Sequence, residues 1–167
     1  QCFDLDSWGA ALSKSASLWD QCNAKGIHLK VLNLGGGFPA NHGEDIPSLE
    51  GTFSYIFQQV SELFDPEVEI QVEPGRGLVA DSGVMITTVI GKATRNDSNW
   101  LYLDCGVFNG LMESIGGINY LYSFNEHVHG EKKIWTLAGP SCDSVDVIAK
   151  NIALNEPEVG DRLSIYP

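Results

Sequence analysis

Three consecutive glycines, Gly35 to Gly37, follow a short apolar run that extends from Leu29 to Leu34. Glycines at the end of a parallel strand let backbone N–H groups approach a ligand closely, and phosphate is the usual ligand of such a loop. A tight turn that needs positive φ angles explains the same residues, and on its own the run favours the turn. The segment LNLGGGFP, residues 32–39, is therefore a candidate anion site that needs support from elsewhere in the chain.

A second candidate site lies at the end of a segment in which apolar and polar residues alternate. The apolar set is Val68, Ile70 and Val72, and the polar set is Glu69, Gln71 and Glu73. This period of two predicts a strand whose apolar side packs on helices. In a closed barrel the polar side faces the lumen, which puts Glu73 at the C-terminal mouth, where barrel active sites lie. Gly75 and Arg76 follow at the rim and could help to hold an anion, although a strand-ending turn with a solvated ion pair accounts for them equally well.

A third candidate site combines a thiol and a carboxylate in the segment LAGPSCDSVD, residues 137–146. A strand is expected to end at its Gly-Pro turn, and a short helix is expected around residues 144–152, capped by Asp143 or Ser144. The thiolate form of a cysteine near a helix N-terminus is favoured, which would make Cys142 reactive. An ordinary cap beside a buried cysteine is the simpler interpretation of the segment alone.

The expected order of helices and strands differs between the first and the second part of the chain. Helical apolar stripes alternate in the first part with short strands, an order typical of parallel βα units; the helices are expected at residues 4–24 and 49–64, and the strands at 29–34 and 68–72. The later strands follow one another without long helices, and we expect them at residues 84–90, 100–103, 134–138 and 162–165. The second part is therefore mostly β, and we place the boundary between residues 78 and 79.

Local signals at the element ends support this division. Gly26 suits the position that ends the first helix. Asp45 or Ser48 can cap the second helix, with Pro47 in its first turn. The strand at residues 29–34 is expected to be buried on both faces, as in a parallel sheet.

The composition argues against several classes of function. A net charge of −12 disfavours nucleic-acid binding, which needs a basic surface; it is compatible with a cationic substrate, although a plain acidic surface is the simpler explanation. No apolar run reaches the roughly 18 residues that cross a membrane. The four cysteines form no C-x-x-C pair and His127 and His129 lie in a polar stretch, so no metal site is expected. Without a visible secretory signal, we expect a cytoplasmic protein with reduced thiols.

Taken together, the motifs GGGFP, EPGR and GPSCDSVD, in this order and spacing, resemble the ornithine, lysine and diaminopimelate decarboxylases that depend on pyridoxal 5′-phosphate (PLP). The stretch LYLDCGVFNG, residues 101–110, is also similar to the family, and the resemblance covers nearly the whole chain. It implies an α/β plus β fold like that of alanine racemase. Residues 1–78 would be the last units of a (β/α)₈ barrel, and residues 79–167 an incomplete β-rich domain.

The resemblance also implies roles for individual residues. Cys142 would deliver a proton to Cα of the substrate, and Asp143 would hold the distal ammonium group. Glu73 would pair with the pyridine nitrogen of PLP. The phosphate would be bound by Gly35, Gly36, Gly37, Gly75 and Arg76. In this family the Cys-Asp pair reaches into the barrel of the neighbouring subunit, so a homodimer with shared active sites is implied.

The family's lysine that forms the Schiff base with PLP is expected before Gln1, and a late tyrosine after Pro167, so this fragment alone is expected to be inactive. The implied reaction is decarboxylation of a basic amino acid, with L-ornithine giving putrescine in polyamine biosynthesis as the leading expectation. Lysine, diaminopimelate, arginine and siderophore-pathway decarboxylases remain alternatives, because Gly116 and Gly117 stand where some ornithine enzymes carry an acid and Glu113 is the nearest carboxylate. A regulatory homologue without catalysis is the alternative of another class.

Overall fold

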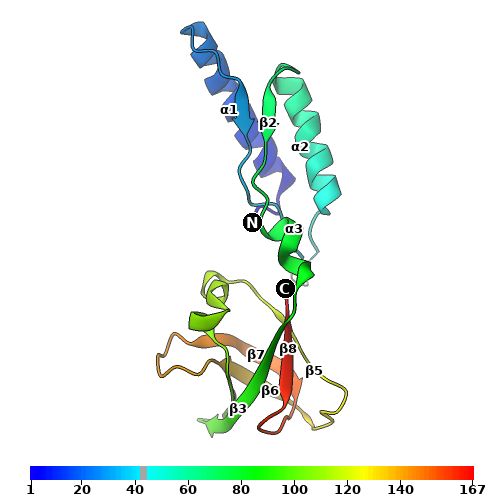
Figure 1. Ribbon diagram of the computed structural model, residues 1–167, viewed down its shortest axis with the longest axis vertical. Coiled ribbons are helices and arrows are strands. Elements are labelled where there is room, and N and C mark those ends of the chain that lie inside the picture. The colour runs from blue at the N-terminus through cyan, green and yellow to red at the C-terminus, as the bar shows by residue number, and fades with distance from the viewer. Residues whose placement is uncertain (42–44) are drawn as a thin grey trace. The chain divides into compact units, whose positions relative to one another are not determined.

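Two compact units make up the chain, residues 1–80 and 81–167, in a computed structural model that describes residues 1–41 and 45–167. The division lies two residues beyond the boundary expected from the sequence. Figure 1 shows helices and a short parallel sheet in the first unit and a large sheet in the second.

Helices and parallel strands alternate in the first unit, as expected. Its elements are α1 (Leu5–Ala24), β1 (Val31–Asn33), α2 (Leu49–Leu63), β2 (Glu69–Gln71) and the single-turn α3 (Arg76–Val79). β1 and β2 are hydrogen-bonded in parallel, with Asn33 opposite Gln71. The pairing continues past the strands, because the Glu73 N–H donates to the Gly35 carbonyl oxygen at 2.7 Å. The two strand ends that carry the glycine loop and Glu73 are therefore neighbours.

Side-chain caps set the ends of the two long helices. Asp4 caps α1 by accepting hydrogen bonds from the N–H groups of Asp6 and Ser7, both at 3.1 Å. Gly26, with φ +75°, follows the helix in the left-handed conformation that glycine adopts readily, as expected. Ser48 caps α2 through its Oγ, which accepts from the Gly51 N–H at 3.0 Å. The placement of Pro47 in the first turn is wrong, because the helix begins after Ser48.

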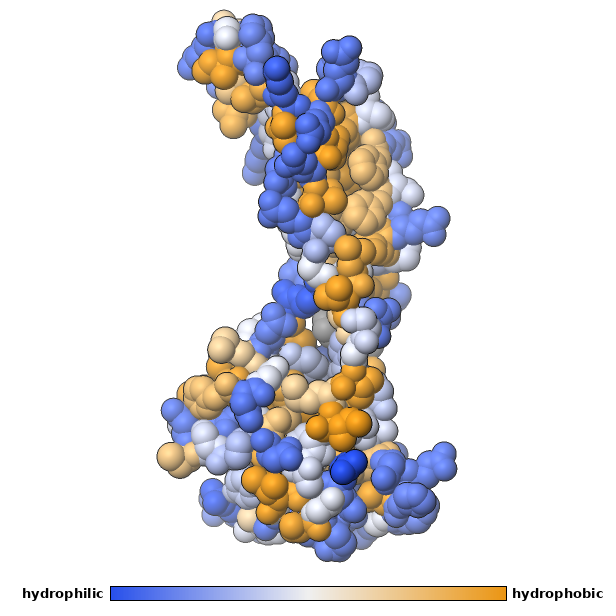
Figure 2. Space-filling view, in the orientation of Figure 1, coloured by the Kyte–Doolittle hydropathy of each residue, from blue (hydrophilic) through white to orange (hydrophobic). Residues whose placement is uncertain are grey.

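Stacked aromatic rings form the centre of the first unit. Phe38, which directly follows the glycine run and is 1% exposed, stacks on Trp8 of α1 and Phe53 of α2, with ring centroids 5.2 and 4.7 Å apart. Leu32 of β1 faces this core, whereas Val31 is 42% exposed. The expectation of a strand buried on both faces is therefore wrong for the described residues, because helices cover one side of the two-stranded sheet only. Figure 2 shows further apolar side chains exposed along α2 and α3.

A six-stranded sheet forms the second unit. Its strands are β3 (Met85–Arg95), β4 (Ser98–Leu103), β5 (Leu121–Phe124), β6 (Lys132–Ala138), β7 (Val147–Asn155) and β8 (Arg162–Tyr166). The order is β5-β8-β3-β4-β6-β7, with β4 and β6 parallel and the other pairs antiparallel. β5 and β7, at the two ends of this order, approach each other, so the sheet is nearly closed. The mostly-β prediction is confirmed, including the four strands expected from the sequence.

The helix expected around residues 144–152 is wrong, because this segment forms most of β7. A bulge interrupts β7 in this segment. Trp135 pairs with Ile152 and Leu137 with Ala149, so Thr136 of β6 lies opposite both Lys150 and Asn151 of β7, and Asn151 takes a φ of +60°. Residues four positions apart lie on the same side of a strand, so the spacing of the inward-facing Ile148 and Ile152 fits a helical turn equally well.

None of the helices among the described residues is both long and apolar enough to span a bilayer. Within the same part of the chain, His, Cys, Asp and Glu side chains form no cluster of three or more that could hold a metal ion. His127 and His129 lie outside helices and strands.

Candidate functional site

Each of the three glycines after β1 is required, either by its backbone conformation or by the lack of space for a side chain. Gly35 and Gly37 have φ angles of +67° and +85°, a conformation that other residues adopt only with strain. At Gly36 a Cβ atom would lie 2.8 Å from the carbonyl oxygen of Glu73. The glycine loop, residues 35–37, therefore combines left-handed turns with a close approach to the neighbouring strand end. The turn explanation of the glycine run is therefore confirmed, and phosphate binding by this loop stays a prediction.

Phe38 anchors this loop to the core. Its ring lies between Trp8 and Phe53, and the Gly37 carbonyl oxygen accepts a hydrogen bond from the Cys2 N–H at 2.8 Å. The segment after Glu73 also approaches Phe38, because a Cβ atom added at Gly77 would lie 3.0 Å from the Cβ of Phe38. The segments GGGFP and EPGRG are thus packed directly against each other.

We expect Phe38→Ala to lower the free energy of unfolding by about 3–5 kcal/mol, because it removes a fully buried aromatic ring and leaves a cavity. Phe57→Ala is the matched control, since Phe57 is 46% exposed at the edge of the same stack. Chemical denaturation followed by tryptophan fluorescence measures both. Equal losses in the two variants would show that Phe38 is not the anchor described here.

Glu73 lies beside the glycine loop, and a shared side chain joins them. Asn33 donates a hydrogen bond from Nδ2 to Oε1 of Glu73 at 2.8 Å, and its Oδ1 accepts the Gly35 N–H at 2.7 Å. Glu73 is exposed, on the side of the strands away from the helices. Sequence reasoning identified Glu73 and the glycines but missed Asn33, whose position in the segment LNLGGGFP, two residues before Gly35, was the only available signal.

Gly75 and Arg76 begin the single turn of α3, directly after Glu73 and Pro74. A Cβ at Gly75 would enter open space, so packing within the described residues does not require glycine there. Arg76 is half-buried. The structure therefore places both residues next to the glycine loop, while their contact with a phosphate stays a prediction.

In the second unit, Cys142 and Asp143 lie exposed at the tip of the loop between β6 and β7. Asp143 Oδ1 accepts the Val145 N–H at 2.9 Å, and the Asp143 N–H donates to the Ser141 hydroxyl at 3.1 Å. The expected helix cap is replaced by this tight turn. The argument that a helix N-terminus activates Cys142 fails, because β7 follows the loop instead.

A buried carboxylate holds this loop in place. Asp146 is 3% exposed, and its two oxygens accept the N–H groups of Val107 and Ser141 at 2.8 and 2.9 Å. A Cβ at Gly106 or at Gly139 would overlap the Asp146 carboxylate, which explains both glycines. Asp146 is the second functional residue that sequence reasoning missed, although it closes the GPSCDSVD motif.

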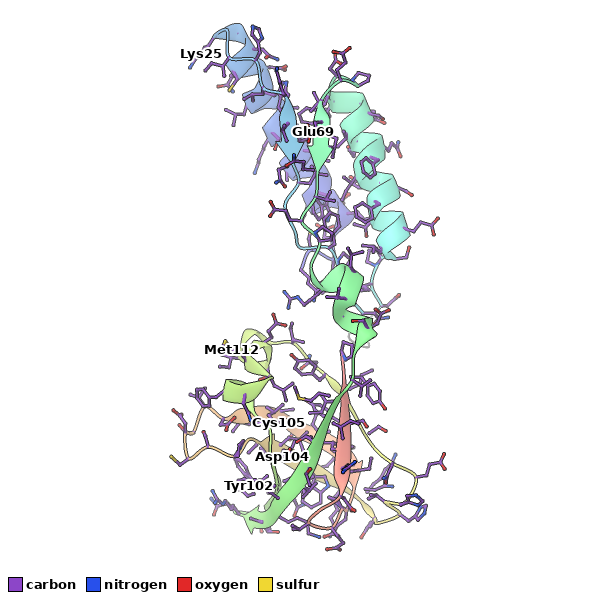
Figure 3. All side chains as sticks on the ribbon, viewed as in Figure 1. Lys25, Glu69, Tyr102, Asp104, Cys105 and Met112 are labelled. Carbon is purple, nitrogen blue, oxygen red and sulfur yellow. The ribbon has the colours of Figure 1, made fainter. Side chains whose placement is uncertain are left out.

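The turn after β4, which resembled the family, is fixed by a second carboxylate. Asp104 Oδ1 accepts hydrogen bonds from the Thr87 hydroxyl at 2.5 Å and the Thr88 N–H at 2.8 Å. Figure 3 labels Asp104 and the neighbouring Cys105 in the second unit. The Thr87 hydroxyl, followed by the Thr88 N–H, lowers the pKa of Asp104 below its ordinary value. The neighbouring Cys105 is half-buried, and burial raises the pKa of its thiol. Cys105 therefore stays a neutral thiol around pH 7.

A lowered carboxyl pKa in the folded state stabilises the fold above the unfolded-state pKa, near 3.8, and this stabilisation is lost as pH falls through the folded-state value. We therefore expect Asp104→Asn to reduce the melting temperature at pH 7 and to make progressively less difference below about pH 4. Thermal melts of both proteins across this range provide the measurement. A difference that stays constant down to pH 3 would contradict the assigned hydrogen bonds.

The three further residues considered for specificity, Glu113, Gly116 and Gly117, lie in the short 3₁₀ helix at Met112–Gly116 and just after it. Gly117 has a φ of +87°, so the turn itself accounts for glycine there. Glu113 is exposed, and a Cβ at Gly116 would meet open space. A side chain at position 116 would therefore meet no packing obstacle among the described residues, and a role of Glu113 or Gly116 in specificity stays a prediction.

Residues 7–166 match the family described as pyridoxal-dependent decarboxylase, C-terminal sheet domain. The chain therefore belongs to the pyridoxal-dependent decarboxylases, whose cofactor is PLP. It is 31% identical over 166 residues to a lysine/ornithine decarboxylase of Selenomonas ruminantium, covering 99% of this chain and 42% of that protein. It is 36% identical over 138 residues to a diaminopimelate decarboxylase of Deinococcus radiodurans, covering 82% of this chain and 34% of that protein.

Solved structures agree with this membership. A lysine/ornithine decarboxylase of Vibrio vulnificus, complexed with cadaverine, superposes with a TM-score of 0.87 at 30% identity, covering 99% of this chain and 45% of that one. The structure of SrLDC in complex with PLP and cadaverine gives a TM-score of 0.86 at 30% identity, with 99% and 43% covered. The chain thus spans less than half the length of these relatives.

The residues present fit the phosphate and ring of PLP. The loop of residues 35–37 has no side chains, and a Cβ at Gly36 would not be accommodated. A carboxylate, Glu73, lies next to this loop, and a guanidinium, Arg76, follows three residues later. A phosphorylated pyridine ring needs N–H donors for its phosphate and a carboxylate acceptor for its protonated ring nitrogen, and this set of groups provides both.

Proposed function

We propose that this chain is part of a decarboxylase of basic L-amino acids, with L-ornithine as substrate and putrescine as product in polyamine biosynthesis. The observation that carries the proposal is the Asn33-mediated link between Glu73 and the glycine loop, at the shared end of two parallel strands. Active sites of parallel barrels lie at this end of the strands. The similarity to lysine/ornithine decarboxylases supports the substrate class.

Residues 1–78 are, in this proposal, the last βα units of a (β/α)₈ barrel, and residues 79–167 belong to the β-rich domain. The parallel pairing of β1 and β2 supports the first assignment. Apolar side chains left exposed on the first unit support it too, since neighbouring barrel units would cover them; they include Val31, Phe57, Leu63, Val72, Leu78 and Val79.

Each candidate residue then has a distinct task toward the cofactor. The glycine loop, with Gly75 and Arg76, binds the phosphate, and Glu73 keeps the pyridine nitrogen protonated through a charged hydrogen bond. When bound, PLP supplies an electron sink for the negative charge left at Cα after CO₂ departs. The chain's own contribution is to position and protonate the ring, which requires a carboxylate at position 73.

Cys142 and Asp143 complete the site in the proposal. The Cys142 thiol delivers a proton to Cα, so that the carbon that lost CO₂ gains hydrogen. Asp143 accepts hydrogen bonds from the distal ammonium group. Their exposure at a loop tip supports contact with a neighbouring subunit and hence a homodimer with shared active sites.

A panel of L-ornithine, L-lysine, L-arginine and diaminopimelate tests the substrate, assayed as CO₂ release by the full-length protein. We expect the highest kcat/KM for L-ornithine, with L-lysine lower by about tenfold or more, since one methylene group is worth about 10–200-fold in a pocket. A higher value for diaminopimelate would overturn the ornithine assignment. Release of CO₂ from none of the four would contradict catalysis and favour a regulatory homologue.

A further inference from the structure

Resting on the proposed function, we propose that Asn33 is a positioning residue that fixes Glu73 and the phosphate loop with one side chain. Its amide donates to Glu73 Oε1 at 2.8 Å and accepts from the Gly35 N–H at 2.7 Å. A carboxylate can only accept and a backbone N–H can only donate, so these two partners dictate which end of the amide faces each. Only a side chain with both a donor and an acceptor can make this bridge.

The register of the strands explains why Asn33 reaches both partners. Asn33 is the last residue of β1 and pairs with Gln71 of β2, and Gly35 and Glu73 are each two residues further along. Side chains two apart in a strand point to the same side. Gln71, the nearest other amide, is already committed, because its Nε2 donates to Glu69 Oε1 at 2.8 Å. Among the described residues, Asn33 is thus the amide that orients Glu73.

The hydrogen bonds of Asn33 also determine which backbone N–H groups of the glycine loop can donate to a phosphate. The Gly35 N–H is occupied by Asn33, and the Gly35 carbonyl by the Glu73 N–H. The N–H groups of Gly36 and Gly37 follow in the same loop. We therefore assign the N–H donors for the phosphate to Gly36 and Gly37. Gly35 instead connects the loop to Glu73, because both its backbone N–H and its carbonyl oxygen are already hydrogen-bonded.

Asn33→Ala in the full-length holoenzyme tests the proposal. We expect kcat to fall about ten- to a hundredfold, as for other residues that orient a ligating group, and PLP affinity to fall about tenfold in an absorbance titration of the apoprotein. The melting temperature of the apoprotein should change little, since Asn33 is exposed. Gln71→Ala is the matched control, because it removes an amide from the neighbouring strand without touching Glu73, and it should leave both kcat and PLP affinity near wild type.

Asn33→Asp separates the two contacts. Aspartate keeps an acceptor for the Gly35 N–H but offers Glu73 a like charge in place of a donor. We expect PLP affinity to return toward wild type, while the acidic limb of the kcat–pH profile moves to higher pH, since a neighbouring carboxylate raises a carboxyl pKa. Glu69 on β2 and Arg76 on α3, the other ionisable groups of these adjoining elements, stay unchanged in all variants.

Equal effects of Asn33→Ala and Gln71→Ala, or wild-type behaviour of Asn33→Asp in both readouts, would overturn the role of Asn33. These outcomes leave the proposed function standing. Failure of the wild-type protein to bind PLP would instead remove the proposed function, and the titration distinguishes the two cases before any turnover is measured.

Discussion

Replacing Glu73 by alanine is expected to reduce kcat for decarboxylation by about 10²–10³-fold, the range found when one preorganised electrostatic partner of a reacting group is removed. The carboxylate lies beside the glycine loop and is oriented by Asn33. In the proposed function, its negative charge holds a proton on the pyridine nitrogen of PLP. Without it, the negative charge that develops at Cα loses its stabilisation, and the barrier rises.

Glu73→Gln refines this experiment. A glutamine can still accept the hydrogen bond from Asn33 Nδ2, so the loop geometry is kept while the charge is lost. We expect it to bind PLP nearly as well as wild type yet to lose kcat almost as far as the alanine variant. Glu69→Gln is the control, because Glu69 lies on the same exposed side of β2 and contacts Gln71 instead. Full activity in Glu73→Gln would show that charge at this position is not required.

Cys142→Ala is the second variant with a large expected effect, a fall in kcat of about 10²–10⁴-fold, the usual contribution of a positioned general acid. The thiol is exposed at the tip of the β6–β7 loop, as the proposed contact with a ligand requires. Losing the proton donor should also misdirect protonation, so that part of the substrate yields a product other than the diamine. Product analysis by mass spectrometry, alongside initial rates, measures both effects.

Two controls make the Cys142 experiment decisive. Cys105→Ala removes a thiol that is half-buried in the core of the second unit, and it should affect stability more than product identity. Asp146→Asn keeps the backbone but neutralises the carboxylate that holds the loop through Val107 and Ser141, so it should lower kcat and leave PLP affinity unchanged. A Cys142→Ala enzyme with wild-type rate and a single diamine product would disprove the assigned role.

Local sequence patterns were sufficient for much of the fold. Helical stripes, the end at Gly26 and the alternation before Glu73 each depend on residues near one another in the chain, so they could be predicted. The bulge at Asn151 could not, because it arises from pairing between β6 and β7. β5 was missed as well, since it is four residues long and follows a 3₁₀ helix.

The candidate site shows the same limit. Glu73 and the glycines were identified because strand ends and glycine runs carry a recognisable pattern. Asn33 and Asp146 were missed, because their roles come from hydrogen bonds to groups that only the folded chain brings near: Asn33 bonds Glu73, 40 residues away, and Asp146 bonds Val107, 39 residues away. The glycines at 106 and 139 have the same origin, since each makes room for the buried carboxylate of Asp146.

The most direct test of the account is a crystal structure of the full-length protein with PLP bound, measuring the distance from the Glu73 carboxylate to the pyridine nitrogen. We expect a hydrogen bond of about 2.7–3.2 Å, with phosphate oxygens at similar distances from the N–H groups of Gly36 and Gly37. A phosphate bound elsewhere, or a ring nitrogen that faces another residue while Glu73 points into solvent, would contradict the proposed site.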